Sequence, residues 1–214
     1  MDNQATTAVD PRVLDAMMPW FSQNFGNAAS RNHQFGWTAE QAVSNARESI
    51  AAAIGAATRE IVFTSGATES NNMAIQGVAR MYQSRGRHLI TCSTEHKAVL
   101  DPMNYLANNG WEVTVLDVDE DGQVPLSSMR EAIRDDTTLV SIMHGNNEVG
   151  TLQPVAEIGA ICREAGVLFH CDATQSVGKE DVNVESMNID LLSCSGHKMY
   201  GPKGTGLLFV RAGT

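Results

Sequence analysis

The chain has 214 residues, a length that suits one sizeable hydrophobic core or one domain with an arm. Its 15 Lys and Arg residues against 25 Asp and Glu residues give a formal net charge of −10, which argues against nucleic-acid or anionic-membrane binding. No apolar run approaches the roughly 18 residues of a membrane-spanning helix, and neither a signal peptide nor an Arg-rich leader is recognisable at the start.

The first 59 residues are predicted to form an N-terminal arm and helices. Asp10 precedes Pro11, which is the pattern of a helix cap followed by proline at the first helical position. Thr38 and Gln41 have the spacing of a capping box, so a second helix is expected to start there and to run to about Gly55.

Residues 60–214 alternate between apolar strand patterns and helix patterns. The strands are expected at residues 60–63, 88–92, 112–118, 138–143, 167–171, 189–192 and 206–210, and the clearest helices at 70–82, 97–108 and 155–165. This alternation predicts an α/β domain with a mostly parallel seven-stranded sheet and helices on both faces. The loop between the last two strands is too short for a crossover helix, so one strand is expected to be antiparallel.

Ligands of such sheets bind beyond the carboxyl ends of the strands, and Lys198 lies at one such end. It belongs to the polar run 193–204, between two apolar strands and beside Ser195 and His197. A lysine in this setting suits an amine that loses its proton and attacks a carbonyl, while Ser195 and His197 could bind a phosphate. The alternative is an ordinary solvated loop lysine.

Residues 64–72 follow the first strand with one glycine and several hydroxyls at the start of a helix. Free backbone N–H groups and the helix dipole favour a phosphate there, although helix capping alone would also explain the hydroxyls. The segment has neither the G-x-G-x-x-G dinucleotide pattern nor a Walker A lysine.

Three more strand ends carry polar groups that could serve a ligand. His96 could stack on a flat ring or move protons, or it could simply cap the next helix. The turn around Asn147 could supply an amide to a ligand oxygen, or be only a turn. Asp172 ends an apolar strand and needs a partner, which a protonated ring nitrogen would provide, with helix capping as the alternative.

Taken together, these groups fit pyridoxal 5′-phosphate: a phosphate cradle, a stacking group, a pyridinium partner, an oxygen donor and an imine-forming lysine. The four cysteines form no C-x-x-C pair, so no metal site is expected. They are interpreted as small buried residues of a protein from a reducing compartment: Cys92, Cys162, Cys171 and Cys194.

In its motifs the sequence closely resembles the cysteine desulfurases of the iron–sulfur assembly and nitrogen-fixation type, which are class V, fold-type-I pyridoxal-phosphate enzymes. The motifs are residues 2–7, 25–27, 30–33, 64–72, 94–100, 146–150, 172–179 and 195–204. So many motifs in the same order make the resemblance specific, and it covers essentially the whole chain.

The resemblance implies catalytic roles for Lys198, which would hold the cofactor as an imine, and for His96, which would stack on its ring and could move protons. Asp172 would pair with the pyridine nitrogen, and Gln175 would contact the phenolic oxygen. Asn147 would contact that oxygen or the substrate.

The remaining implied cofactor contacts are those to the phosphate, namely Ala67, Thr68, Ser195 and His197. The resemblance further implies conversion of L-cysteine to L-alanine, with the sulfur passed to a protein cysteine as a persulfide. It implies a homodimer that delivers sulfur to an iron–sulfur scaffold or another acceptor protein. The expected location is the cytoplasm, or the mitochondrial matrix if a leader has been removed.

The chain departs from the family pattern at its C-terminal end, after Arg211. Residues 60–214 are therefore expected to be the cofactor-binding large domain, without the small domain and without the loop that carries the nucleophilic cysteine. Such a chain is expected to be inactive as a desulfurase. The alternatives are a related lyase or aminotransferase activity, such as β-elimination or selenocysteine lysis, and a truncated subunit without catalytic activity.

Overall fold

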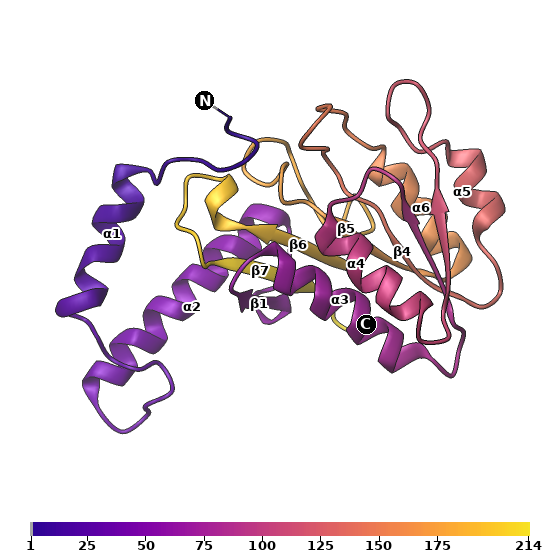
Figure 1. Cartoon of the computed structure of the whole chain (residues 1–214). Helices are drawn as coiled ribbons and strands as arrows, with labels where there is room; N and C mark the ends of the chain where they lie inside the picture. The colour runs from indigo at the N-terminus through magenta and orange to yellow at the C-terminus, as the bar shows by residue number, and fades with distance from the viewer. Residues whose placement is uncertain (1) are drawn as a thin grey trace.

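The computed structural model describes residues 2–214. A seven-stranded sheet forms the middle layer, and α1 (Pro11–Ser22) and α2 (Gln34–Ile54) extend from one end of it (left in Figure 1). The other helices are α3 (Ala67–Tyr82), α4 (Lys97–Ala107), α5 (Leu126–Ala132) and α6 (Val155–Ala165), with short 3-10 turns η1 (Thr58–Glu60) and η2 (Gly196–Lys198).

The strands lie in the order β1-β7-β6-β5-β4-β2-β3. Their bounds are β1 Ile61–Thr64, β2 His88–Cys92, β3 Glu112–Leu116, β4 Thr137–Ser141, β5 Leu168–Asp172, β6 Leu191–Ser195 and β7 Gly206–Val210. β7 is antiparallel to both of its neighbours, and all other neighbouring pairs are parallel. The prediction of a mostly parallel sheet with one reversed strand is confirmed.

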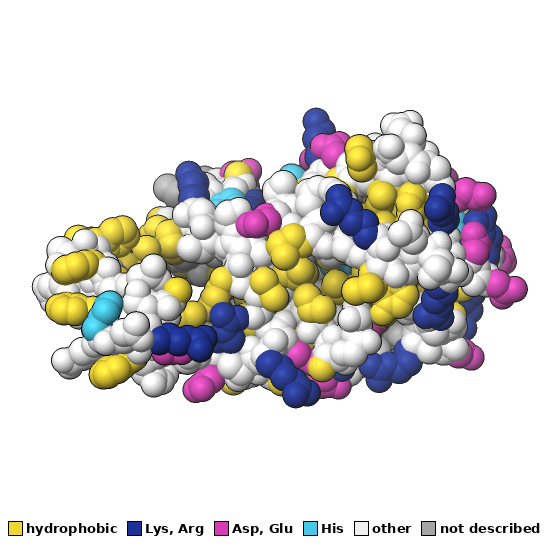
Figure 2. Space-filling model, turned by 90° about the horizontal axis from the view of Figure 1, so that it is seen from below, with side chains coloured by type: hydrophobic (Ala, Val, Ile, Leu, Met, Phe, Trp, Pro, Cys, Tyr) yellow, Lys and Arg dark blue, Asp and Glu magenta, His cyan; other side chains and the backbone are white. Residues whose placement is uncertain are grey.

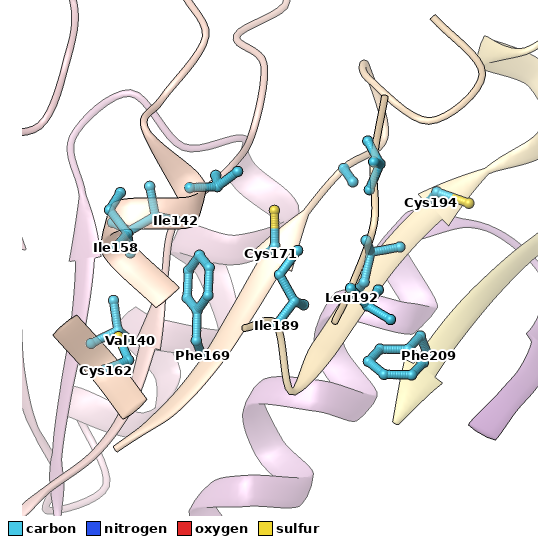
Figure 3. Packing of buried hydrophobic residues seen from close by; sticks show 14 of the residues in the cluster. Val140, Ile142, Ile158, Cys162, Phe169, Cys171, Ile189, Leu192, Cys194 and Phe209 are labelled. Atoms are coloured by element: carbon cyan, nitrogen blue, oxygen red, sulfur yellow. The ribbon is translucent and has the colours of Figure 1, made fainter. Parts of the chain in front are cut away.

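Neighbouring residues of each strand pack on opposite faces, as the period of two in a strand requires. In β5, Phe169 packs toward α5 and α6, whereas Leu168 packs toward α3 and α4. Figure 3 shows the first of these cores, with Phe169 near Val140 and Ile158. Helices therefore cover both faces, which explains why the buried strands read as continuous apolar runs.

The first helix starts as predicted, and the second does not. Asp10 caps α1 by accepting a hydrogen bond from the backbone N–H of Arg12. α2 begins at Gln34, four residues before the predicted start at Thr38, because the His33 ring accepts from the Gly36 N–H and caps the helix there. A histidine cap gives a weaker sequence signal than the Ser, Thr, Asp and Asn caps that patterns favour.

The start of α3 is fixed by its close approach to β7. A Cβ atom on Gly206 would lie 2.5 Å from the Cα of Gly66, so only glycine permits this contact. The Ser70 hydroxyl donates to the Leu207 carbonyl oxygen at 2.8 Å and holds the first turn of α3 against the sheet. The N-terminus of α3 is thereby held at the edge where the parallel strands end.

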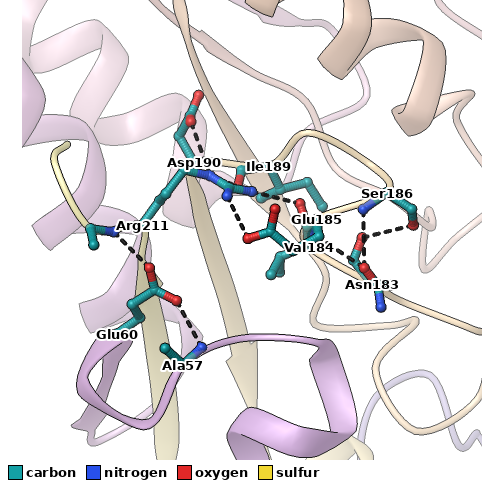
Figure 4. Close-up of polar contacts among 10 residues, drawn as sticks. Ala57, Glu60, Asn183, Val184, Glu185, Ser186, Ile189, Asp190 and Arg211 are labelled. Carbon is teal, nitrogen blue, oxygen red and sulfur yellow. Dashed lines mark hydrogen bonds and ion pairs between the residues drawn. The ribbon is translucent and has the colours of Figure 1, made fainter.

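Polar contacts hold the chain after β7 to the opposite edge of the sheet (Figure 4). Glu60 accepts from the backbone N–H groups of Ala57 and Ala212, and Arg211 pairs with Glu185 and with Asp190. These contacts fix the C-terminal end of the reversed strand.

One group of exposed large apolar side chains lies on the two N-terminal helices and the segment between them. Figure 2 shows them gathered at the end where Figure 1 places α1 and α2. They include Leu14, Met18, Trp20, Phe21, Phe25, Phe35 and Trp37. Within residues 2–214, no helix is both long and apolar enough to cross a membrane.

Candidate active site

A cavity of about 620 Å³ lies at the edge where β1, β2, β4, β5 and β6 end. This is the edge at which parallel α/β sheets bind ligands. All nine residues predicted for the cofactor site line it: Ala67, Thr68, His96, Asn147, Asp172, Gln175, Ser195, His197 and Lys198. The structure thus brings together residues that are up to 131 positions apart in the sequence, from Ala67 to Lys198.

Lys198 ends the η2 turn after β6 and is partly buried. Its Nζ donates to the backbone carbonyl oxygens of Gln4 and Ala5, the latter at 3.0 Å. Burial and the nearby Lys179 lower the pKa of Lys198, while Asp2 and Asp172 oppose the shift. A lowered pKa increases the fraction of neutral amine, which is the nucleophilic form.

Asp172, the last residue of β5, is 5% exposed. Its Oδ2 accepts from the Asn71 side-chain amide at 2.7 Å, and its Oδ1 accepts from the Thr174 backbone N–H at 3.0 Å. In the structure this carboxylate is paired with a side-chain amide of α3 and with a backbone N–H of the turn after β5. No helix begins in that turn, so the helix-capping alternative for Asp172 is wrong. These two donors fix the rotation of the carboxylate while one side of Asp172 still lines the cavity.

His96 is the N-cap of α4, so the capping alternative for this residue is correct. Its Nδ1 accepts from the Ala98 backbone N–H at 3.0 Å. In a neutral ring the proton then lies on Nε2. Because the imidazole also lines the cavity, capping and a role toward a ligand are compatible.

Polar groups at the α3 end of the cavity are suited to binding an anion. The α3 N-terminus contributes Ala67 and Thr68, whose backbone N–H groups belong to the unpaired first turn. Ser195 and His197 line the same cavity, and the Ser195 hydroxyl lies close to Gly66 at the start of α3. The His197 Nδ1 is within 3.0 Å of the Thr6 hydroxyl oxygen, which ties this ring to the N-terminal arm.

Asn147 and Gln175 both line the cavity, and Gln175 has a further contact. Its Nε2 donates to the Gln4 carbonyl oxygen at 2.9 Å. In the neighbouring turn Asn146 is structural, because its amide donates to the Thr94 carbonyl oxygen and its Oδ1 accepts from two backbone N–H groups. Of the two neighbouring asparagines, Asn146 and Asn147, only Asn147 lines the cavity.

Sequence reasoning missed two contributions to the site. The first is the N-terminal arm, whose Gln4 and Ala5 carbonyl oxygens meet Lys198. The second is Asn71, which holds Asp172. Residues 2–7 and 64–72 are both among the motifs that resemble the family, so the sequence did mark these segments. It did not mark the contacts themselves, because neither a backbone carbonyl oxygen nor a helix residue that meets a distant strand leaves a sequence signal of its own.

The four cysteines are all buried, and none lines the cavity. Burial raises the pKa of Cys194 to about 12, and Asp172 adds to the shift. No group of three or more His, Cys, Asp or Glu side chains in residues 2–214 is arranged to hold a metal ion.

The donor set fits pyridoxal phosphate. The Asp172 carboxylate could accept from a ring N–H, and the Lys198 amine, whose pKa is lowered, could react with the aldehyde. The N-terminus of α3, with the nearby hydroxyl and imidazole groups, could bind the phosphate. One feature works against a dianion: Glu69 lines the same wall and accepts from the N–H and hydroxyl of Ser65. A phosphate would therefore lie on the Ala67, Thr68, Ser195 and His197 side.

The fold is that of the pyridoxal-phosphate enzymes of fold type I, and the chain belongs to the aminotransferase class V family, whose model matches residues 1–214. Among curated relatives, cysteine desulfurase IscS of Anaeromyxobacter sp. (strain Fw109-5) is 61% identical over 99% of this chain. A probable mitochondrial cysteine desulfurase of Dictyostelium discoideum is 55% identical, also over 99% of this chain.

Solved structures agree with this assignment. A structure of SspA in complex with cysteine superimposes with a TM-score of 0.96 at 47% identity, and covers 99% of this chain and 60% of its own. A NifS-like protein gives a TM-score of 0.97 at 42% identity, over 100% of this chain and 59% of its own. The 214 residues span 52% of the Anaeromyxobacter relative and 47% of the Dictyostelium one, so they correspond to about half of each.

Proposed function

We propose that this chain is the pyridoxal-phosphate-binding large domain of a cysteine desulfurase, which converts L-cysteine to L-alanine and passes the sulfur to a protein cysteine. The observation that carries the proposal is the convergence of Lys198, Asp172 and the phosphate-end residues on one cavity. The names of the relatives support the substrate, since the similar SspA structure contains cysteine.

Each proposed role follows from a contact of this chain. Lys198 would attach the cofactor through its amine, whose partial burial favours the neutral form. Asp172, fixed by Asn71, would hold a proton on the ring nitrogen. His96 would stack on the ring, and its Nε2–H would face the reacting centre, where it could move a proton. The bound cofactor would supply an electron sink for the substrate carbon.

We further propose that the nucleophilic cysteine comes from outside the described residues. A persulfide requires an accessible thiolate, and Cys92, Cys162, Cys171 and Cys194 are all buried away from the cavity. On this proposal residues 60–214 are the cofactor domain and residues 1–59 its arm and helices. The arm would share in the site, because Gln4 and Ala5 contact Lys198.

The proposed partners are a second copy of the chain and a sulfur-acceptor protein such as an iron–sulfur scaffold. Exposed apolar side chains on the two N-terminal helices support association, because patches of this kind mark interfaces. A reducing compartment, the cytoplasm or the mitochondrial matrix, is proposed because all four cysteines are free.

A related reaction, β-elimination, is the second candidate. It needs the lysine and the ring site but no thiol, and the burial of all four cysteines favours it for the isolated chain. The two reactions differ in their products, because desulfuration of L-cysteine yields alanine whereas elimination yields pyruvate.

Titration with pyridoxal phosphate tests the proposal. The wild-type chain should develop the visible absorbance of a lysine imine, and borohydride should fix the cofactor to the protein. Lys198→Ala should lose the fixed adduct, whereas Lys97→Ala should keep it, because Lys97 is exposed and does not line the cavity. Equal adduct in Lys198→Ala and wild type would refute the assignment.

A further inference from the structure

Glu95 is a carboxyl group that the proposed function does not use. It lies in the turn between β2 and α4, directly before His96, and is 6% exposed. Its side chain points inward, where Oε1 accepts from the backbone N–H of Met143 and from the thiol of Cys92 at 3.6 Å. It does not line the cavity, so it lies behind the cavity wall.

The surroundings of Glu95 favour an uncharged acid. Oε2 is buried and has no hydrogen-bond partner within residues 2–214, and no Lys or Arg of that range forms an ion pair with Glu95. A buried carboxylate is costly when it has no ion-pair partner and when one of its oxygens accepts no hydrogen bond, so the group takes up a proton instead. Burial first and Asp172 second raise the pKa of Glu95 well above its usual range.

Glu60 offers the opposite case in the same chain. It is buried to a similar degree, but its carboxylate oxygens accept from two backbone N–H groups (Figure 4), and Arg211 is near. Burial acts to raise the pKa of Glu60, and the bonds from Ala212 and Ala57 with the Arg211 charge outweigh it, so the pKa is lowered.

The contacts of Glu95 join two strand ends that flank the cavity. Met143 follows β4 and lines the cavity, and its N–H is bound by Glu95 in the turn that carries His96. Asn146 holds the same turn from the other side through the Thr94 carbonyl oxygen. The His96 turn is therefore braced against the β4 end by one carboxyl and one amide.

We propose that Glu95 is a positioning residue which, as a neutral acid, fixes the His96 turn to the end of β4 and leaves the neighbouring Asp172 as the carboxylate of this pair. The effect of Glu95 on cofactor binding through His96 rests on the proposed function. The claim that neutral Glu95 holds the His96 turn against the end of β4 does not. The titratable groups that face Glu95 are Cys92 on β2 and Asp172 and Cys171 on β5. Both thiols are protonated because burial raises their pKa values.

The first test uses the cofactor-free chain and Glu95→Gln, which keeps a neutral acceptor and donor in place. Urea unfolding of both proteins is measured from about pH 5.5 to 8.5. A proton must be taken up on folding above the unfolded pKa, so wild type should lose stability relative to Glu95→Gln as pH rises. The ratio of their unfolding constants should change by up to about tenfold per pH unit until the folded pKa is reached.

Glu60→Gln is the matched control. Glu60 is ionised in both states throughout this range, so its variant should be less stable than wild type by an amount that does not change with pH. If the offset of Glu95→Gln is equally independent of pH, Glu95 is a carboxylate and the proposal is wrong.

The second test asks whether Glu95 positions His96. The NMR resonance of the His96 ring Cε1–H should shift in Glu95→Ala and return close to its wild-type position in Glu95→Gln. If it stays unchanged in Glu95→Ala, or if Glu95→Gln fails to restore it, Glu95 is not a positioning residue. Should Glu95→Ala fail to fold, Glu95→Leu takes its place, because leucine removes both hydrogen bonds of Glu95 and keeps most of the side-chain volume.

Cofactor affinity then connects the brace to the proposed function. The dissociation constant of pyridoxal phosphate should rise by on the order of tenfold in Glu95→Ala, because a displaced His96 stacks poorly, and recover in Glu95→Gln. An affinity in Glu95→Ala equal to wild type would remove the link to the ring site. A wild-type chain that binds no cofactor would instead refute the proposed function and leave the first two tests valid.

Discussion

Replacing Asn71 by alanine should destabilise the cofactor-free chain by an amount that the structure allows us to estimate. Asn71 is fully buried, and its amide donates to the Asp172 carboxylate at 2.7 Å. A hydrogen bond to a charged group contributes about 1.5–3 kcal/mol. With Asp172 only 5% exposed, water has little access to replace the donor. We therefore expect a loss of about 2 kcal/mol, or roughly thirtyfold in the unfolding constant.

Urea unfolding at neutral pH measures this loss, with the slope of free energy against urea expected to stay unchanged. Asn72→Ala is the control, because Asn72 is the same residue type one position on and donates to Thr68 of its own helix. That change should stay within about 0.5 kcal/mol. A loss below about 0.5 kcal/mol for Asn71→Ala would show that Asn71 does not hold the carboxylate.

Three further predictions concern the site and the cysteines. Asp172→Ala should weaken pyridoxal-phosphate binding by about ten- to a hundredfold and nearly abolish exchange of the substrate α-proton, and unchanged exchange by NMR would remove Asp172 from the site. Burial lowers the pKa of His170 to about 4, against an opposing effect of Asp172; stability should therefore fall as pH drops from about 6.5 toward 4, and less so in His170→Gln. A pH-independent difference between these two proteins would contradict that. The loaded 214-residue chain incubated with L-cysteine should form no stoichiometric persulfide, as mass spectrometry would show, because every thiol is buried: Cys92, Cys162, Cys171 and Cys194.

Much of the fold could be predicted because its signals are local. Short apolar strands alternating with helices that end at glycines indicate a parallel sheet, and the short loop between β6 and β7 indicates the reversed strand. The site followed from one rule, that strand ends of a parallel sheet meet at one edge. This rule alone predicts that His96, Asp172 and Lys198 lie close together, and in the structure all three line one cavity.

The remainder depends on particular contacts that leave no pattern in the sequence. The arm reaches Lys198 through backbone carbonyl oxygens, which any residue could supply. The start of α2 depends on a His33 ring meeting the Gly36 N–H. For Glu95, burial without an ion pair and without a partner for Oε2 favours the neutral form, and that burial is set by the packing around β2, β4 and β5. Sequence patterns contain none of these distances.

The central claim is that the cavity holds pyridoxal phosphate on Lys198. The most direct measurement is borohydride reduction of the cofactor-loaded chain, followed by proteolysis and mass spectrometry of the peptides that contain its four lysines: Lys97, Lys179, Lys198 and Lys203. The account predicts one reduced pyridoxyl group per chain, on Lys198. An adduct spread over the other lysines, or none at all at saturating cofactor, would contradict it.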